Sequence, residues 1–108
     1  MRALRLFTGP DGRSHVEEID LPAGITAVRT AQFAESPPGS ALDWHTAPQR
    51  QYVVTLAGTL EFTTRDGEAF TLRPGDVLLA EDLAGSGHRW RLIDDQPWRR
   101  LYVALDPA

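Results

Sequence analysis

Turn-forming residues recur along this chain at short intervals, and this spacing constrains the fold more than any other feature of the sequence. Gly, Pro and Asp cluster at residues 9–12, 22–24, 37–39, 66–67, 74–76, 85–87 and 94–97. Gly accepts positive φ and Pro fixes its own φ, so such clusters mark turns. The segments between them are roughly five to ten residues long, which suits strands better than helices. We therefore expect an all-β sandwich or barrel.

The clearest strand signal is an alternation over residues 60–65. Leu60, Phe62 and Thr64 share one face, and the residues between them are Glu, Thr and Arg. An Asp-Gly pair at 66–67 follows, and residues 69–72 continue with mainly apolar side chains. This pattern predicts a β-hairpin with a two-residue turn.

Three other segments are apolar on both faces, namely residues 52–56, 77–80 and 101–105. Strands with this pattern are covered on both sides. One cover is then the barrel core, and the other is a partner subunit. We expect these strands and the N-terminal segment 4–8 to pair in a homodimer.

Length and composition limit what the chain can form. It has 108 residues and a mass of 12.0 kDa, which allows one hydrophobic core and no second. We therefore expect a single domain over residues 1–108. Hydrophobic residues make up 42% and charged residues 24% of the chain, which is typical of a globular protein.

The charged residues and the missing residue types exclude several functions. All eleven basic residues are Arg, the net charge is -4, and no basic run is present, so we expect no nucleic-acid partner. The absence of Lys excludes Schiff-base chemistry and the P-loop. The absence of Cys excludes disulfides, thiolate nucleophiles and Cys-ligated metals. His, carboxylate, amide, Tyr, Ser and Arg side chains remain for any chemistry.

No apolar run approaches the roughly 18 residues that a membrane-spanning helix needs. The N-terminal apolar stretch is short and is interrupted by Arg5, unlike a signal peptide. We therefore expect no membrane partner and a cytoplasmic location.

The middle of the chain carries a motif with a recognisable spacing. Gly39 is followed by His45, Ala47, Gln51 and Gly58. In this spacing the chain resembles the cupin superfamily, whose first motif has a Gly, two His, a Glu and a Gly at these positions. Ala47 stands in place of the second His and Gln51 in place of the Glu. The resemblance covers about residues 37–92 and implies a single jelly-roll β-barrel, the cupin-like double-stranded β-helix.

The second motif of that superfamily is matched less completely. Gly85 and His88 keep its spacing, whereas Leu83 and Leu92 replace a Pro and an Asn. Because successive side chains of a strand alternate, His88 shares a face with Trp90 and Leu92. We expect His88 to point into the barrel, and the resemblance places the histidine of the first motif inside as well.

The resemblance implies a metal site formed by His45, Gln51 and His88, because strands around a barrel can direct such groups at one interior point. The implied cofactor is a divalent metal ion, either Fe, Mn, Ni or Zn. An amide oxygen is a weaker donor than a carboxylate, so we expect weaker binding than by the full cupin set. The alternative is a metal-free pocket in which both His are hydrogen-bonded polar groups. The third histidine, His15, is expected to be exposed on a strand.

Five further residues are predicted at or near the pocket. Trp44, Tyr52 and Trp90 are expected to wall it, unless they belong to the ordinary core. Glu81 and Asp82 are paired carboxylates near the expected site. Turned inward, one of them would serve as a general base or a ligand, whereas in a turn both would accept backbone hydrogen bonds. The sequence singles out no catalytic residue.

Three functions remain open. The first is a metal-dependent cupin enzyme of the oxygenase or isomerase type, acting on a small anionic or enolisable molecule. The second is a metal-free module that binds a small organic molecule in the barrel interior. The third is a structural or regulatory barrel whose pocket is filled by its own side chains. We expect the first or the second, with a small-molecule ligand.

Overall fold

In the computed structural model, residues 1–106 are described and form ten strands and no helix. The strands are β1 (Arg2–Thr8), β2 (Ser14–Asp20), β3 (Val28–Ser36), β4 (Ala41–His45), β5 (Gln51–Ala57), β6 (Leu60–Thr64), β7 (Ala69–Leu72), β8 (Val77–Glu81), β9 (His88–Leu92) and β10 (Trp98–Leu105). The all-β prediction is therefore confirmed. Within this part of the chain, no helix has the length and apolar character needed to cross a membrane. The predicted domain also includes residues 107–108, which lie outside the described residues.

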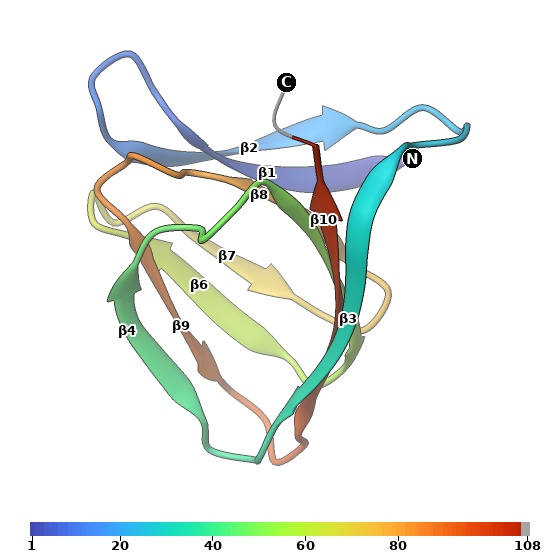
Figure 1. Cartoon of the computed structure of the whole chain (residues 1–108). Helices are drawn as coiled ribbons and strands as arrows, with labels where there is room; N and C mark the ends of the chain where they lie inside the picture. The colour runs from blue at the N-terminus through green and yellow to red at the C-terminus, as the bar shows by residue number, and fades with distance from the viewer. Residues whose placement is uncertain (107–108) are drawn as a thin grey trace.

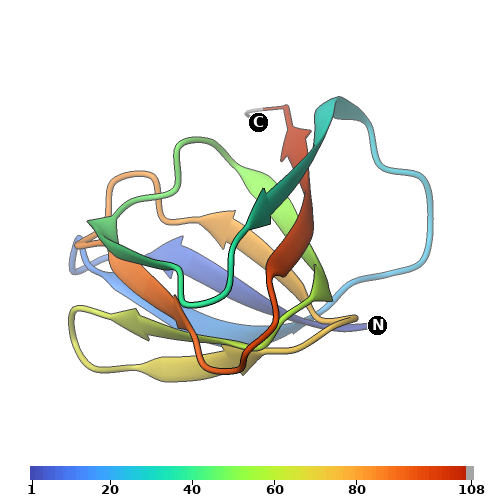
Figure 2. The ribbon, with the colours of Figure 1, turned by 90° about the horizontal axis from the view of Figure 1, so that it is seen from below.

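The strands form two sheets that pack face to face (Figure 1). One sheet has six strands in the order β2-β1-β8-β5-β10-β3, and the other has four in the order β4-β9-β6-β7. Neighbouring strands are antiparallel except for β1 and β8, which are parallel. Most neighbours in a sheet are distant in the sequence, as in a jelly roll. Seen from below, the two layers enclose one interior (Figure 2).

The predicted hairpin is present, but its turn is longer than expected. Leu60, Phe62 and Thr64 are buried on β6, as the alternation predicts, and β6 pairs with β7. The Thr64 backbone N–H donates to the carbonyl of Glu68 at 2.8 Å, so three residues form the loop rather than two. Gly67, at φ 88°, supplies the positive φ that ends such a three-residue turn.

The core lies between the inner faces of the two sheets. Leu60 and Leu72 from the four-stranded sheet and Leu6 from the six-stranded sheet are fully buried in one cluster. Burial stabilises each such side chain by about 1.5–3 kcal/mol relative to water. Trp98 joins this cluster with an exposed fraction of 2% and stands edge-to-face against Trp90 at 4.7 Å. The cluster fixes the positions of the strands that carry the site.

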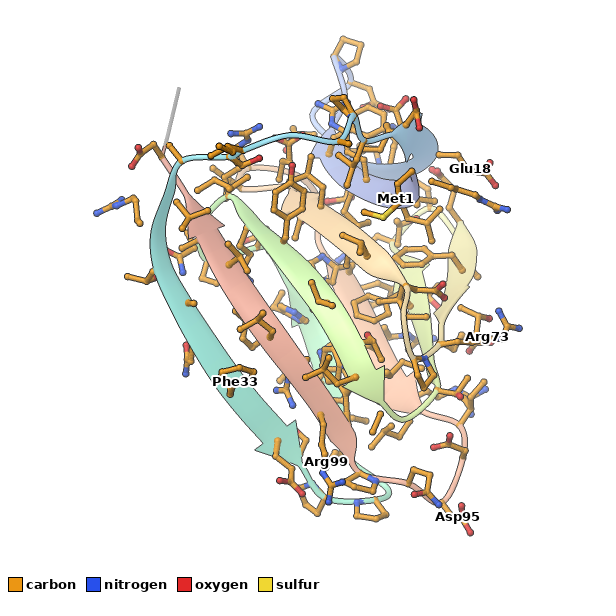
Figure 3. All side chains as sticks on the ribbon, turned by 90° about the vertical axis from the view of Figure 1, so that its right-hand side faces the viewer. Met1, Glu18, Phe33, Arg73, Asp95 and Arg99 are labelled. Carbon is orange, nitrogen blue, oxygen red and sulfur yellow. The ribbon has the colours of Figure 1, made fainter. Side chains whose placement is uncertain are left out.

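The outer face of the six-stranded sheet is apolar and partly exposed. The segments that are apolar on both faces lie in β5, β8 and β10, which are the adjoining central strands of this sheet. Leu56 on β5 is 51% exposed. Phe33, on the edge strand β3 next to β10, is 77% exposed (Figure 3). The N-terminal segment expected to pair across a dimer lies in β1, which is hydrogen-bonded on both edges by β2 and β8. The available edges of this sheet are therefore β2 and β3.

Candidate functional site

The inner faces of the two sheets enclose a cavity of about 310 Å³. This volume lies near the lower end of the range of about 300–1,000 Å³ that is usual for small-molecule sites. Residues from both sheets and from the loop between β4 and β5 line it: Gln32, Leu42, His45, Ala47, Pro48, Gln49, Gln51, Val53, Phe62, Leu78, Ala80, His88, Trp90, Trp98, Arg100 and Tyr102.

Two histidines lie side by side in this cavity. His45 ends β4 and His88 begins β9, and the two are directly opposite each other in the antiparallel pair. Their ring centres are 4.3 Å apart at an interplanar angle of 61°. Gly87, at φ 94°, allows the close approach, because a side chain there would come within 3.0 Å of the His45 carbonyl oxygen. Both imidazoles are thus within reach of one shared ligand.

Each of these histidines uses only one ring nitrogen within the protein. The His45 Nδ1–H donates to the carbonyl oxygen of Asp43 at 2.8 Å, and the His88 Nδ1–H donates to a carboxylate oxygen of Asp82 at 2.7 Å. No described residue hydrogen-bonds either Nε2. Burial lowers the pKa of His45, which favours its neutral form. The pair therefore offers two Nε2 lone pairs to a ligand.

Asp82 fixes the orientation of His88 from behind. It is fully buried, and Ser14 Oγ donates to the same carboxylate oxygen at 2.9 Å. Ser14 Oγ in turn accepts the Gly87 backbone N–H at 2.9 Å. The other oxygen, Asp82 Oδ1, has no hydrogen-bond partner among the described residues. A carboxylate behind a histidine is the usual support of a metal-binding imidazole, because it fixes the tautomer and raises basicity.

Gln51 begins β5, is buried with 6% exposed, and lines the same cavity. Its Oε1 accepts only a long hydrogen bond of 3.4 Å from Gln49 Nε2. Ala47 also lines the cavity and brings no donor, as the motif spacing indicates. His45, His88 and Gln51 therefore line one cavity, to which they bring two imidazole rings and one amide.

The structure separates the other predicted pocket residues. Trp90 lines the cavity. Trp44 and Tyr52 do not: Trp44 lies under the guanidinium groups of Arg65 and Arg89 at 4.8 Å each, and Tyr52 borders a different surface depression. Both side chains belong to outer faces of the sheets.

The paired carboxylates also have different roles. Asp82 does not line the cavity but contacts it through His88, as described above. Glu81 faces away and forms ion pairs with Arg5 and with Arg50, the latter at 2.5 Å. Burial opposes its ionisation, but the hydrogen bonds from these two Arg side chains lower the pKa of Glu81 overall. Neither carboxylate takes the place expected for backbone-capping groups in the glycine-rich turn.

Arg100 is a site residue that our sequence analysis did not identify. It is 9% exposed, lines the cavity, and stacks over Trp98 with its guanidinium carbon 4.0 Å from the ring centre. The signal was present in β10, where Trp98, Arg100 and Tyr102 alternate with outward residues. Ser14 was also missed, because its contact with Asp82 spans 68 residues and leaves no local pattern.

A second histidine cluster lies away from the cavity. Among the described residues, Asp11, His15 and Asp66 have potential metal-binding atoms within 4.8 Å of one another. Both nitrogens of His15 are already taken, by Asp11 at 2.8 Å and Glu68 at 2.6 Å. These two carboxylates raise the pKa of His15 and favour its charged form, which has no lone pair for a metal. His15 lies on strand β2, as expected, but its side chain is only 27% exposed because it is held in these ion pairs.

Comparison with known proteins agrees with this geometry. Residues 32–104, which are more than half of the chain, match the family model described as the cupin domain. The chain belongs to the cupin family. This match includes both histidines of the cavity and most of the strands that surround them.

One curated relative and two solved structures are also similar to the chain, and the two structures support the fold alone. A cupin-domain-containing oxidoreductase, srdB, of Neurospora crassa is 36% identical over 89 residues, which are 82% of this chain and 42% of that protein. The chain therefore spans less than half the length of this relative. The cupin domain of Schizosaccharomyces pombe Cnp3 has a TM-score of 0.55 and 16% identity, covering 98% of this chain and 83% of that one. The conserved protein SPY1581 of unknown function from Streptococcus pyogenes has a TM-score of 0.51 and 19% identity, covering 72% and 64%.

Proposed function

We propose that this cupin binds a small molecule in the cavity between its sheets, next to a divalent metal ion held by His45, His88 and Gln51. One observation carries the proposal: two imidazoles lie side by side in the cavity with Nδ1 engaged and Nε2 available. Imidazole nitrogens arranged in this way suit Fe, Mn, Ni and Zn, with His generally favouring the later members of the series.

The donor set fits such an ion, although less strongly than a set with a carboxylate. Two imidazoles and one amide oxygen supply three neutral ligands, and the polarised His88 strengthens one of them. A bound divalent ion would supply a Lewis acid that polarises an oxygen of the ligand. Fe in particular would support oxidative chemistry, which agrees with the name oxidoreductase of the Neurospora crassa relative.

The other residues of the chain position the ligand and control its surroundings. Asp82 and Ser14 hold the His88 ring in one orientation, and the backbone carbonyl of Asp43 does the same for His45. Phe62 and Trp90 form an apolar part of the cavity wall, against which a bound ligand is partly shielded from water. Such a wall strengthens every polar contact that a ligand makes inside the cavity.

A second candidate is a metal-free cupin that binds a small molecule without transforming it. The replacement of two family ligands by Ala47 and Gln51 favours this alternative, because it removes both a donor and the only negative charge of the set. The cavity residues would then bind the ligand through hydrogen bonds to the two free Nε2 atoms and the Gln51 amide.

Metal content decides between these two functions. Elemental mass spectrometry on protein purified without chelators should find close to one divalent ion per chain. The ion should be lost from His45→Ala and from His88→Ala. A matched control is His15→Ala, which removes the histidine outside the cavity and should keep the ion. Metal-free protein, even after anaerobic reconstitution with Fe, Mn, Ni or Zn, would contradict the metal site and leave the metal-free alternative.

We also propose that the cupin forms a homodimer through the outer face of β3, β10 and β5. Phe33 and Leu56 on this face are 77% and 51% exposed, and β3 is an edge strand nine residues long. An unpaired edge strand can pair with another chain, and exposed apolar patches often mark protein–protein interfaces. Light scattering at micromolar concentration should give a dimer, and Phe33→Glu should give a monomer with an unchanged cavity. A monomeric unmodified protein would contradict the proposal.

The cytoplasmic location expected from the sequence stays a prediction.

A further inference from the structure

Beyond the two histidines, the cavity contains one permanent charge, on Arg100. We propose that the cavity selects ligands that carry a carboxylate group and that Arg100 binds this carboxylate. The inference rests on the proposed function, because it names the class of small molecule that the cavity takes.

The guanidinium of Arg100 is buried without a counter-charge. Nε donates to the Tyr102 hydroxyl at 2.9 Å, and Nη1 donates to Ser36 Oγ at 2.9 Å and to the Trp98 carbonyl at 3.1 Å. All three acceptors are neutral. Among the described residues, none accepts a hydrogen bond from Nη2 and no carboxylate forms an ion pair with Arg100. Buried charges are normally paired with an opposite charge, and the Arg100 guanidinium has no such partner among the described residues.

The cavity wall contains no negatively charged side chain. None of its lining residues is Asp or Glu, and its remaining polar groups include the amides of Gln32, Gln49 and Gln51. Asp82 lies behind His88 and not on the wall. A ligand carboxylate would therefore meet one fixed positive charge and several amide N–H donors in apolar surroundings, where such contacts are stronger than in water.

The held orientation of Arg100 suits a carboxylate. Trp98 supports one face of the guanidinium at 4.0 Å, and the three neutral acceptors fix its rotation. Because these acceptors engage Nε and Nη1, Nη2 is the group left to donate to a ligand, and its charge-assisted N–H groups suit a carboxylate oxygen. The Arg100 side chain is held in this orientation without a ligand, which reduces the entropy cost of binding one.

Arg100 and the two histidines line the same cavity, and a row of aromatic side chains along its wall connects them. Trp98, on which Arg100 stacks, contacts Phe62 at 6.1 Å between ring centres, and Phe62 lies 5.9 Å from the His88 ring. A ligand whose carboxylate binds Arg100 would thus direct its other end along this wall toward His45 and His88. Molecules with a carboxylate at one end and an oxygen-bearing group at the other fit this arrangement, within a volume of about 310 Å³.

The experiment compares matched acids and amides. Isothermal titration calorimetry and thermal shift, in a buffer free of carboxylates, use acetate, pyruvate and benzoate against acetamide, pyruvamide and benzamide. The proteins are the unmodified chain, Arg100→Gln and Arg100→Lys; the Lys variant retains the charge but loses the contacts that orient the guanidinium. Arg99→Gln is the matched control, because this neighbouring Arg points outward, with 59% of its side chain exposed, and pairs with Glu35.

At least one carboxylate should bind the unmodified cupin at least about tenfold more tightly than its amide, since charge-assisted bonds are roughly twice as strong as neutral ones. The preference should persist in Arg99→Gln, weaken in Arg100→Lys and vanish in Arg100→Gln. Three results would overturn the inference: no acid binds, acids and amides bind equally, or Arg100→Gln retains the preference. Metal loading of the same samples separates the two proposals, because a metal-loaded cupin without acid preference retains the function and loses only this inference.

Discussion

The chain has two histidine regions, and they differ in how many ring nitrogens the protein itself occupies. His15 is held by a carboxylate on each nitrogen, Asp11 on one side and Glu68 on the other. His45 and His88 each have one nitrogen engaged, and both line the cavity. The first arrangement stabilises a positive charge at the surface. The second leaves lone pairs inside an apolar cavity, where only a ligand can use them.

The comparison also shows how similar residue types acquire different roles. Both regions contain His and Asp side chains, and the cluster around His15 is the richer in carboxylates. Proximity of ligand-type atoms alone would therefore select the surface cluster as the metal site. The proposed metal site is instead the pair formed by His45 and His88, because both line the cavity and no described residue hydrogen-bonds their Nε2 atoms.

Removing the carboxylate behind His88 should have the largest effect. Asp82→Ala should lower the free energy of unfolding by about 2–4 kcal/mol, because it leaves His88 and Ser14 without their buried acceptor. It should also reduce Zn²⁺ affinity by about 10–100-fold, because His88 loses its orienting partner. Urea unfolding and zinc titration measure the two effects. Asp11→Ala removes a carboxylate from His15 and is the control, with zinc affinity in the cavity unchanged. Unaltered zinc affinity of Asp82→Ala would refute the supporting role.

Adding a carboxylate next to His45 and His88 should strengthen metal binding in the cavity. Gln51→Glu should raise the affinity for divalent ions by about tenfold or more, since a charged oxygen is a stronger donor than an amide. The metal-free variant should be less stable than the unmodified protein, because a buried carboxylate is poorly solvated. Gln96→Glu, which adds the same charge at an exposed position in the loop between β9 and β10, should change affinity much less. Equal gains in both variants would show that Gln51 does not coordinate.

Loosening the contact between β2 and the site should have a smaller effect. Ser14→Ala removes the donor to Asp82 and the acceptor of the Gly87 N–H, and should cost about 1–2 kcal/mol of stability. Thermal and chemical unfolding measure the change. Ser40→Ala removes an exposed hydroxyl that bonds only the Pro37 carbonyl, and should change stability by less than about 0.5 kcal/mol. If the two variants were equally stable, the buried network would be energetically unimportant.

The surface histidine should show the smallest effect, and one that depends on pH. Its two carboxylates raise the pKa of His15 in the folded state above the ordinary value of 6.5. The folded protein therefore binds this proton more tightly than the unfolded chain does. Its stabilisation is complete below about pH 6.5 and is lost as the pH rises through the raised pKa. The difference in melting temperature between the unmodified protein and His15→Gln should shrink from pH 6 to pH 9. A difference that grows over this range would contradict the ion pairs.

Much of the fold could be predicted because it follows from local patterns. The alternation of Leu60, Phe62 and Thr64 gave the buried face of β6, and the same rule gave the inward side of His88. The predicted length of the turn between β6 and β7 was one residue too short, because an Asp-Gly pair also suits a three-residue loop that ends in Gly. Element boundaries depend on such backbone details, which residue type alone leaves open.

The site was less predictable because its decisive contacts join distant residues. The partner of Asp82 is Ser14 on β2, and the orientation of Trp44 depends on Arg65 from the turn after β6 and on Arg89 from β9. Arg100 could have been found, since the alternation along β10 places it on the inner face with Trp98. Arg side chains are mostly exposed, so the burial of Arg100 does not follow from its residue type.

The most direct test of this account is long-range ¹H–¹⁵N NMR of the three histidines, before and after Zn²⁺ is added to metal-free protein. We expect His45 and His88 to carry hydrogen on Nδ1 and to bind zinc through Nε2, with large shifts of those two Nε2 signals. The signals of His15 should stay unchanged. Hydrogen on Nε2 of the cavity pair, or zinc-dependent shifts at His15 alone, would contradict the assignment of the site.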